Sequence, residues 1–324
     1  MACYARRVRF TTALMAALIV LAAVAADARA SNLVFVCGKN LCAAGGEGGG
    51  RLALTHDGRG RGGYSRPSLA RNGKLIAFKL GDPGRVWTAN LKRRRGRIVA
   101  IGRRTRIEAF RDGPRDATQF DVALSPRGKR VAWVEIRANV VFGDFDFRRY
   151  SARVDGGDAR QEASNGGRPF VAWASESEII REGLAPGFDA EAADSGLCVP
   201  SPQSATNGTC TQGSRQLALD PAGRHLRHPS LAAGGRLLAA TAYARPGSDI
   251  DSSIEQPGAV ALFDATTAAP VRDLTDGPND LFPSFAPNAK AVAFERGGAV
   301  WTVPAQGGKA KRLLRRARQP TWSR

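Results

Sequence analysis

A short segment recurs along the chain, and it limits the possible folds more than any other feature. Each copy has a short apolar start, a polar turn centred on Gly or Asn, a basic residue and an alternating apolar strand, as in PSLARNGKLIAF and PSFAPNAKAVAF. Later strands with period-two alternation follow most copies, so each unit contains about four short strands. Such units cannot bury their own faces and are typical of β-propeller blades. Copies, two of them degenerate or truncated, begin near residues 67, 122, 171, 229, 283 and 320.

The two ends of the chain supply complementary parts of one unit. The last copy, PTWSR, stops after a first strand, whereas residues 31–66 lack a first strand. The segment from Leu33 aligns without a gap on the last complete unit, with Val34 on Ala293 and Leu41 on Val300. The sequence therefore predicts an all-β, six-bladed propeller of four-stranded antiparallel blades. Its C-terminal strand pairs with the N-terminal strands, which leaves no exposed sheet edge at the seam.

Two stretches resemble a known family of repeats. LTDGPNDLFPSFAPNAKAVAF and LTHDGRGRGGYSRPSLARNGKLIAF are similar to the repeats of TolB-type six-bladed propellers. In those repeats, Leu-Thr and a Gly-containing loop lead into Pro-Ser-Phe-Ser-Pro-Asp-Gly and a strand that ends in Ala-Phe. The resemblance covers nearly all of residues 31–324 and concerns the propeller only, without the α/β domain that precedes it in TolB. It implies the fold and, more loosely, the binding of other proteins.

Residues 1–30 have the three parts of a signal peptide. Three arginines lie near the start, an uncharged run covers 10–26, and Ala28-Arg-Ala30 follows. Small residues at these last positions predict cleavage after Ala30 and export of 31–324 as a secreted, extracytoplasmic protein. An uncleaved anchor is the alternative, because an apolar run of about 17 residues approaches the length that spans a bilayer. No later segment is long and apolar enough to do so.

The chain is strongly basic, with a formal net charge of +19. Removal of the leader takes away four Arg and one Asp and leaves +16. Such a charge favours polyanions. However, only eight of the 48 basic residues are Lys, and the Arg are scattered, as in proteins from GC-rich genomes, so composition is the first explanation. The local cluster at 309–318 predicts an edge strand whose charges prevent aggregation. We expect a monomer with no specific nucleic-acid partner.

Four cysteines remain after the leader, and an even number in an exported chain favours disulfides over metal binding or catalysis. The two short-range pairings are Cys198 with Cys210 and Cys37 with Cys42. The first would close an irregular stretch. The second is disfavoured because a hairpin would place the two residues diagonally rather than opposite each other. Free buried thiols are the alternative.

The residues that usually carry chemistry form no recognisable constellation. His225 and His228 are three residues apart, but they are expected in a loop before the strand at Pro229 and no third ligand is visible. A Gly-x-Ser-x-Gly elbow is absent, and the glycine runs lie between strands rather than before a helix. We therefore expect no catalytic residue, no metal and no cofactor.

Two segments are candidates for binding a partner. The stretch 140–150 mixes aromatic and charged residues that would form an adhesive rim if exposed; its candidate contact residues are Phe142, Asp144, Phe145, Asp146, Arg148 and Tyr150. A hairpin with one buried aromatic face is the alternative. The insertion at 183–214 departs most from the blade pattern and is expected to protrude from one face of the ring. The alternative is a disordered excursion without function.

These observations lead to one hypothesis and two alternatives. The leading hypothesis is a secreted, non-enzymatic scaffold that binds a protein or a cell-envelope ligand through loops on one face. One alternative is a propeller enzyme that acts on polysaccharide in the central channel. The other is a basic polyanion or wall-polymer binder, whose affinity would fall steeply with ionic strength.

Overall fold

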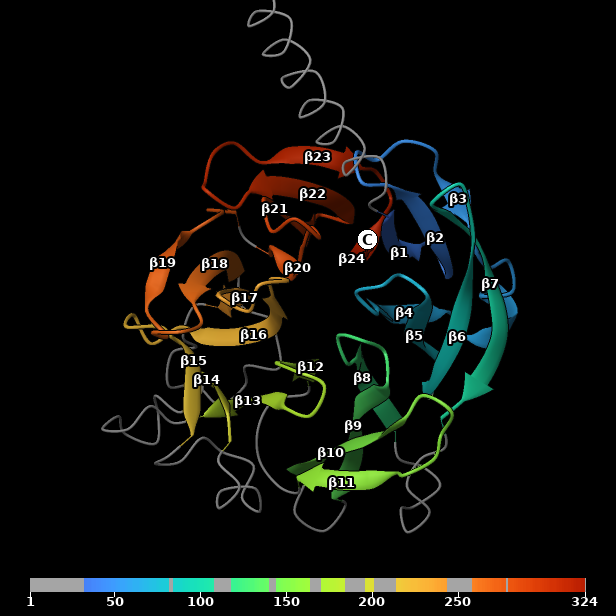
Figure 1. The fold of residues 1–324 in the computed structure, drawn as a ribbon, viewed down its shortest axis with the longest axis horizontal. Coiled ribbons are helices and arrows are strands. Elements are labelled where there is room, and N and C mark those ends of the chain that lie inside the picture. The colour runs from blue at the N-terminus through green and yellow to red at the C-terminus, as the bar shows by residue number, and fades with distance from the viewer. Residues whose placement is uncertain are drawn as a thin grey trace, which may run out of the picture.

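The computed structural model describes residues 32–81, 84–107, 118–139, 144–163, 170–183, 196–200, 214–243, 258–277 and 279–323. They form six four-stranded antiparallel sheets that stand as blades around a common axis (Figure 1). Helical structure in these residues is limited to one 3-10 turn, Arg59–Arg61. No helix within the described ranges has the length and apolar character needed to cross a membrane. The all-β, six-bladed prediction is confirmed.

Each blade contains four strands that follow one another in sequence, except at the seam. Blades 1 to 3 comprise β4 (Tyr64–Leu69), β5 (Leu75–Leu80), β6 (Arg85–Arg94) and β7 (Arg97–Arg106); β8 (Thr118–Leu124), β9 (Arg130–Asn139), β10 (Asp144–Arg153) and β11 (Arg160–Ala163); and β12 (Ala172–Trp173), β13 (Ile179–Gly183), β14 (Gly196–Val199) and β15 (Arg215–Leu219). Blades 4 to 6 comprise β16 (His225–Leu231), β17 (Leu237–Tyr243), β18 (Gly258–Asp264) and β19 (Pro270–Asp273); β20 (Leu281–Phe285), β21 (Ala291–Arg296), β22 (Ala299–Pro304) and β23 (Lys311–Leu314); and β24 (Arg318–Ser323), β1 (Asn32–Cys37), β2 (Asn40–Gly45) and β3 (Leu52–Ala53).

The repeat starts inferred from the sequence coincide with the first strands of the blades. Five of them fall inside β4, β8, β16, β20 and β24, and Val171 directly precedes β12. The first strand of every blade lies nearest the axis, and the fourth forms the outer edge (Figure 1).

The seam is closed by strands from both ends of the chain. β24 pairs with β1 in an antiparallel register that sets Asn32 opposite Ser323 and Leu33 opposite Trp322. β1 and β2 also have the same lengths and register as β21 and β22, as the gapless alignment predicts. The predicted closure is therefore confirmed.

The hydrophobic core is divided into six clusters, one between each pair of neighbouring blades. Alternation along a strand sends successive side chains to opposite faces. In β1, Val34 and Val36 pack against blade 1, whereas Leu33 and Phe35 pack against blade 5. Both faces of each inner sheet are therefore covered, and burial of one such large side chain contributes about 1.5–3 kcal/mol.

The region 183–214 is not a single insertion, which corrects the sequence interpretation. Residues 196–199 form β14, the third strand of blade 3, and all four are buried between β13 and β15. A blade needs this strand to cover its neighbours, so the irregular Ala-, Asp- and Ser-rich flanks concealed a regular element. The remaining connections, 184–195 and 201–213, lie outside the described residues.

The outer hairpin of blade 1 overlaps the seam. β6 and β7 are ten residues long each, and their tip is tied to the buried Asn32 of β1. The Asn32 amide donates to the Gly96 carbonyl (3.0 Å), and the Ile98 N–H donates to Asn32 Oδ1 (3.0 Å). This hairpin therefore links blade 1 to blade 6 at the rim.

Candidate functional site

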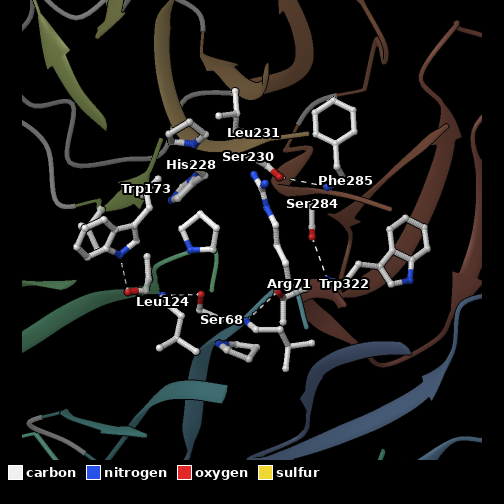
Figure 2. A pocket seen from close by; sticks show the side chains of 18 of the residues that line it. Ser68, Arg71, Leu124, Trp173, His228, Ser230, Leu231, Ser284, Phe285 and Trp322 are labelled. Carbon is white, nitrogen blue, oxygen red and sulfur yellow. Dashed lines mark hydrogen bonds between the residues drawn. The ribbon is translucent and has the colours of Figure 1, made fainter. Parts of the chain in front are cut away.

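A cavity of about 990 Å³ lies on the axis of the ring (Figure 2). It is lined by the first strand of every blade and by the turns that follow these strands, so its mouth opens on the face that carries those turns. One residue from each blade occupies the equivalent inner position: Pro67, Val122, Val171, Pro229, Pro283 and Pro320. The recurring Pro of the repeat is therefore a wall of this cavity.

The hydroxyl that follows Pro in the repeat joins neighbouring blades. The first strands are sheet edges, and their inner N–H groups need acceptors. A Ser or Thr hydroxyl accepts from the N–H of the next blade's first strand at four of the six junctions: Ser68 from Leu124 (3.0 Å), Ser230 from Phe285 (3.1 Å), Ser284 from Trp322 (3.1 Å) and Thr321 from Leu69 (3.4 Å) (Figure 2). In blade 2, Ala123 takes the place of this Ser or Thr, and the Ala123 carbonyl oxygen accepts a hydrogen bond from Trp173 Nε1 of blade 3 (3.0 Å).

Substitution of Ser284 by Ala is expected to lower the free energy of unfolding by about 1–2 kcal/mol, because the N–H of Trp322 loses its acceptor next to the cavity. Urea denaturation of the purified ring measures this loss. The matched control is Ser177→Ala, because Ser177 is exposed on a turn and its change should be within about 0.5 kcal/mol of zero. Equal stabilities of the two variants would show that these hydroxyls do not join the blades.

The residue before Pro is held in an unusual backbone conformation in four blades. Arg66, His228, Phe282 and Gln319 have φ values of 52°, 51°, 54° and 49°, in the left-handed region that non-glycine residues seldom adopt. Each lies at an irregularity in the pairing of the first strand. Bulges of this kind redirect a side chain, and all four residues line the cavity.

These residues and Asp121 of blade 2 form a cluster that we call the inner ring: Arg66, Asp121, His228, Phe282 and Gln319. The Arg66 guanidinium lies over the Phe282 ring (4.3 Å from its centroid), and its Nε is 3.8 Å from Asp121 Oδ1. The His228 ring contacts Phe282 from blade 4, with 4.3 Å between centroids. Gln319 Oε1 accepts from the Arg66 N–H (2.6 Å). Five blades therefore contribute to one contact network inside the channel.

Two titratable groups of the inner ring have displaced pKa values. Burial raises the pKa of Asp121, although the Arg66 charge and the N–H groups of Val171 and Val122 act in the opposite direction. Burial also lowers the pKa of His228 well below its usual range, and the charges of Arg66 and Arg227 lower it further. His228 is therefore neutral at pH 7. Its Nδ1 is buried and has no hydrogen-bond partner among the described residues. Displaced pKa values in a cavity mark a candidate functional site.

Arg71 narrows the mouth of the cavity. It belongs to the turn after β4, and its side chain extends across the opening to blade 4 (Figure 2). Nη1 donates to the Ala233 carbonyl (3.0 Å) and Nη2 to the Ala232 carbonyl (3.4 Å). A ligand that enters from this face therefore meets a guanidinium that donates to main-chain oxygens of the turn after β16.

The candidate contact residues in 140–150 would have to be exposed to bind a partner. The two whose side chains the structure describes, Arg148 and Tyr150, are partly and fully buried. Tyr150 is fully buried and stacks on Trp133, with 5.7 Å between ring centroids, so it cannot touch a partner directly. Arg148 is partly buried. The side chains of Asp144, Phe145 and Asp146, and all of Phe142, lie outside the described residues, and their binding role stays a prediction.

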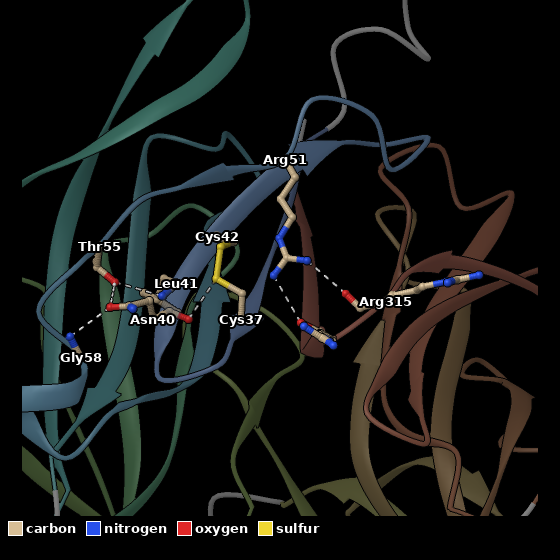
Figure 3. Close-up of a disulfide and its surroundings, with 9 residues drawn as sticks. Cys37, Asn40, Leu41, Cys42, Arg51, Thr55, Gly58 and Arg315 are labelled. Atoms are coloured by element: carbon tan, nitrogen blue, oxygen red, sulfur yellow. Dashed lines mark hydrogen bonds between the residues drawn. A yellow bond between two sulfur atoms is a disulfide. The ribbon is translucent and has the colours of Figure 1, made fainter.

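Of the two disulfide pairings considered from the sequence, the structure contains the one that hairpin geometry disfavoured. Cys37 and Cys42 form a disulfide, with 5.9 Å between their Cα atoms (Figure 3). They are indeed diagonal, because Cys37 lies opposite Asn40 and Cys42 opposite Phe35. The twist of the hairpin brings this diagonal within the usual disulfide range of about 4.4–6.8 Å. Cys198 is buried in β14 and disulfide-bonded, whereas Cys210 lies outside the described residues, so their pairing stays a prediction.

Both histidines expected in a loop lie in β16, the first strand of blade 4. In the described part of the chain, no group of three or more His, Cys, Asp or Glu side chains is placed to hold a metal ion. The inner ring was not identified from the sequence, although a signal was present. The residue before Pro varies among Arg66, His228, Phe282 and Gln319, whereas Pro followed by Ser or Thr recurs after each of them.

Comparison with known proteins finds similarity at the level of structure. No protein-family profile matches the sequence, and no curated protein matches it. Among solved structures, TolB from Acinetobacter baumannii superposes with a TM-score of 0.64 at 16% identity, over 92% of this chain and 68% of that one. A nidogen–laminin complex gives 0.60 at 13% identity, over 90% and 98%. A putative TolB from Agrobacterium tumefaciens gives 0.53 at 14% identity, over 88% of both chains. The chain is therefore a six-bladed β-propeller with the fold of TolB-like proteins.

Proposed function

We propose that this ring is a non-enzymatic scaffold that binds a protein or a cell-envelope ligand at the face where the axial cavity opens. The cavity itself carries the proposal. Its volume of about 990 Å³ is at the upper end of the usual range for ligand sites. Turns from the blades surround its mouth, so a ligand seated there contacts several blades at once. Its walls combine Pro and apolar side chains with a few polar groups, which suits an extended segment of a partner chain.

The similar structures support a binding role by analogy. One of them is a complex of nidogen with laminin, in which a propeller of this fold is found together with another protein. At 13% identity the likeness concerns the fold alone. The ligand of the present chain is therefore proposed from its own cavity.

We also propose that the protein works outside the cytoplasm. The Cys37–Cys42 disulfide supports an oxidising compartment, because cytosolic thiols are kept reduced. The signal-peptide pattern of residues 1–30 supports the same location.

A bulky residue at the cavity mouth is expected to abolish ligand capture. Ala233 is exposed on the turn that receives Arg71, so Ala233→Trp obstructs the opening without touching the core. The matched control is Lys39→Trp, which adds the same ring to an exposed turn on the opposite face. Cell-envelope extracts are passed over each immobilised variant and washed at high salt. We expect a ligand that wild type and Lys39→Trp retain and that Ala233→Trp loses at least tenfold. Equal retention by all three would contradict binding at this face.

A second candidate, an enzyme acting in the channel, is favoured by the inner ring. Asp121 with a raised pKa and neutral His228 could act as acid and base on a substrate held by Arg66. Turnover of a polysaccharide by the wild type, with loss of turnover but not of binding in Asp121→Asn, would favour this candidate over the scaffold.

A further inference from the structure

Charge is divided unevenly around the ring. Residues 118–264, which form blades 2 and 3 and most of blade 4, contain 15 basic and 18 acidic residues. Residues 31–117 and 265–324, which form the rest of the ring, contain 29 basic and 10 acidic residues. An arginine-rich composition explains why basic residues occur everywhere. It does not explain why the acidic residues that would balance them are so few in blades 5, 6 and 1.

The excess is greatest along the outer edges of these three blades. Residues 85–106 contain nine basic and no acidic residues, and residues 296–324 contain eight basic and none acidic. We call ten of the exposed basic side chains of this edge the basic rim: Arg51, Lys92, Arg94, Arg95, Arg97, Lys309, Lys311, Arg312, Arg315 and Arg316. Arg103 and Arg106 of β7 are exposed as well but lie farther from the tip of the hairpin. Arg104 is left out because Asp57 accepts its hydrogen bond (3.0 Å).

Contacts of blade 6 with its two neighbours bring the three parts of the basic rim together. Arg51 of blade 6 donates through Nη1 to the Arg315 carbonyl (3.1 Å) and through Nη2 to the Arg316 carbonyl (3.4 Å) (Figure 3). On the other side, a Cβ atom at Gly50 would lie only 2.9 Å from Arg97 Nη1. The outer edges of blades 5, 6 and 1 therefore form a continuous basic surface.

Exposed apolar side chains accompany these charges. Leu52, Val99 and Val271 are the large hydrophobic residues exposed in the described part of the chain, at 41%, 38% and 42%. Leu52 and Val99 are each two residues beyond the Gly50–Arg97 contact, on the outermost strands β3 and β7. A hydrated polyanion offers no environment for such side chains, whereas the interface of an anionic bilayer accepts both guanidinium and apolar groups.

Protection of sheet edges accounts for part of this pattern only. β23 is the outermost strand of blade 5, as the cluster at 309–318 predicts, and charge on such an edge prevents pairing with other chains. Charges of either sign serve this purpose. The outer strand of blade 2, β11, carries Arg160 and Glu162. The strong excess of one sign over three consecutive blades, in which Glu47 is an exposed exception, therefore indicates a further selective advantage.

We propose that the basic rim binds the phosphate headgroups of an anionic membrane surface, with Leu52 and Val99 in contact with the interfacial layer. The planar guanidinium matches a phosphate through paired hydrogen bonds, and ten cationic groups are available. Bound in this way, the ring stands edge-on to the bilayer. The axial cavity opens on a face perpendicular to that edge, so it stays accessible and the proposal is independent of what the cavity binds.

Co-sedimentation of residues 31–324 with lipid vesicles tests this proposal. The probes are vesicles of phosphatidylglycerol with phosphatidylcholine, and vesicles of phosphatidylcholine alone, at low and high salt. The rim variant combines Arg94→Glu, Arg97→Glu and Arg312→Glu. Its control combines Lys129→Glu, Arg153→Glu and Arg236→Glu, which make the same charge change at exposed positions of blades 2 and 4. We expect the rim variant to lose at least tenfold in affinity for anionic vesicles and the control less than threefold.

Equal losses in the two variants would show that net charge alone acts, and no binding of wild type to anionic vesicles would overturn the proposal. Should the rim variant fail to fold by circular dichroism, Arg→Gln at the same three positions gives the same test with half the charge change.

A second experiment distinguishes lipid from other polyanions. Leu52→Ser with Val99→Ser should weaken vesicle binding severalfold and leave binding to a DNA duplex unchanged. Duplex binding as tight as vesicle binding, with neither affected by this pair, would make the rim a general polyanion site and the membrane assignment wrong.

Discussion

Deletion of residues 320–324 is expected to abolish cooperative folding of the whole ring. The deleted segment provides most of β24, which pairs with β1 and closes the seam. Trp322 belongs to the core between blades 5 and 6, and the Thr321 hydroxyl accepts from Leu69 of blade 1. The loss exceeds about 5 kcal/mol, which is comparable to the entire stability of many domains. Circular dichroism should then show no cooperative thermal transition at 25–90 °C, a range set about the usual melting temperatures of domains.

Two further variants distinguish the effect of ring closure on stability from the effect of shortening the chain. Trp322→Ala keeps the strand but removes its core side chain, and should cost about 3–5 kcal/mol. Arg318→Ala changes a residue of the same strand whose side chain is 68% exposed, and should leave the melting temperature unchanged. An unaltered transition in the deletion variant would mean that the seam does not hold the ring together.

Substitution of Trp133 by Ala is expected to be among the most damaging single changes, at about 3–5 kcal/mol. Trp133 is fully buried in the core between blades 1 and 2, where it stacks on Tyr150. Its Nε1 also donates to Glu135 Oε1 (2.9 Å), and Glu135 is itself fully buried. The variant therefore creates a large cavity and removes a donor from a buried carboxyl group. Equilibrium unfolding in urea gives the change in free energy.

The control for this change is Trp301→Ala in blade 5. Trp301 is partly exposed and stacks with the Arg296 guanidinium, 5.4 Å from the ring centroid, so its removal opens no enclosed cavity. We expect a loss of about 1–2 kcal/mol, since Trp301 lies at the margin of its core cluster and part of its surface is already in water. If both substitutions cost the same, burial between blades would not be what stabilises this fold.

The architecture was predictable because a blade is encoded locally and repeated. Alternation within a dozen residues identifies each first strand, and Pro67 and Pro283 lie where the repeat predicts them. Closure was predictable for the same reason, since the match of Val34 to Ala293 needs no gap. Where the local pattern is short the inference failed, as at Gly196–Val199, because four residues between irregular flanks do not show a period.

The candidate site was much less predictable, because it is made from single positions about fifty residues apart. Arg66, His228 and Phe282 become neighbours only when the ring closes. Their left-handed backbone cannot be inferred from residue type, since the surrounding bulge imposes it. The Cys37–Cys42 bond was disfavoured because flat-hairpin reasoning ignores twist.

The charge asymmetry could have been found by counting the two signs separately. Because Arg is scattered evenly along the chain, the total count of basic residues does not show that 85–106 contains no acidic residue. The blade pattern then assigns that stretch to the outer hairpin of one blade.

The shared seam also sets an order in time for a chain made from its N-terminus. β1, β2 and β3 are synthesised first, yet the strand that completes their sheet is the last to appear. Until β24 is synthesised, β1 therefore has an open edge and the apolar side chains of Leu33 and Phe35 lack their partner Trp322. Such an exposed edge pairs readily with other chains. A nascent chain that lacks β24, or a product truncated before it, should thus be the form most prone to aggregation, and synthesis of β24 ends that hazard.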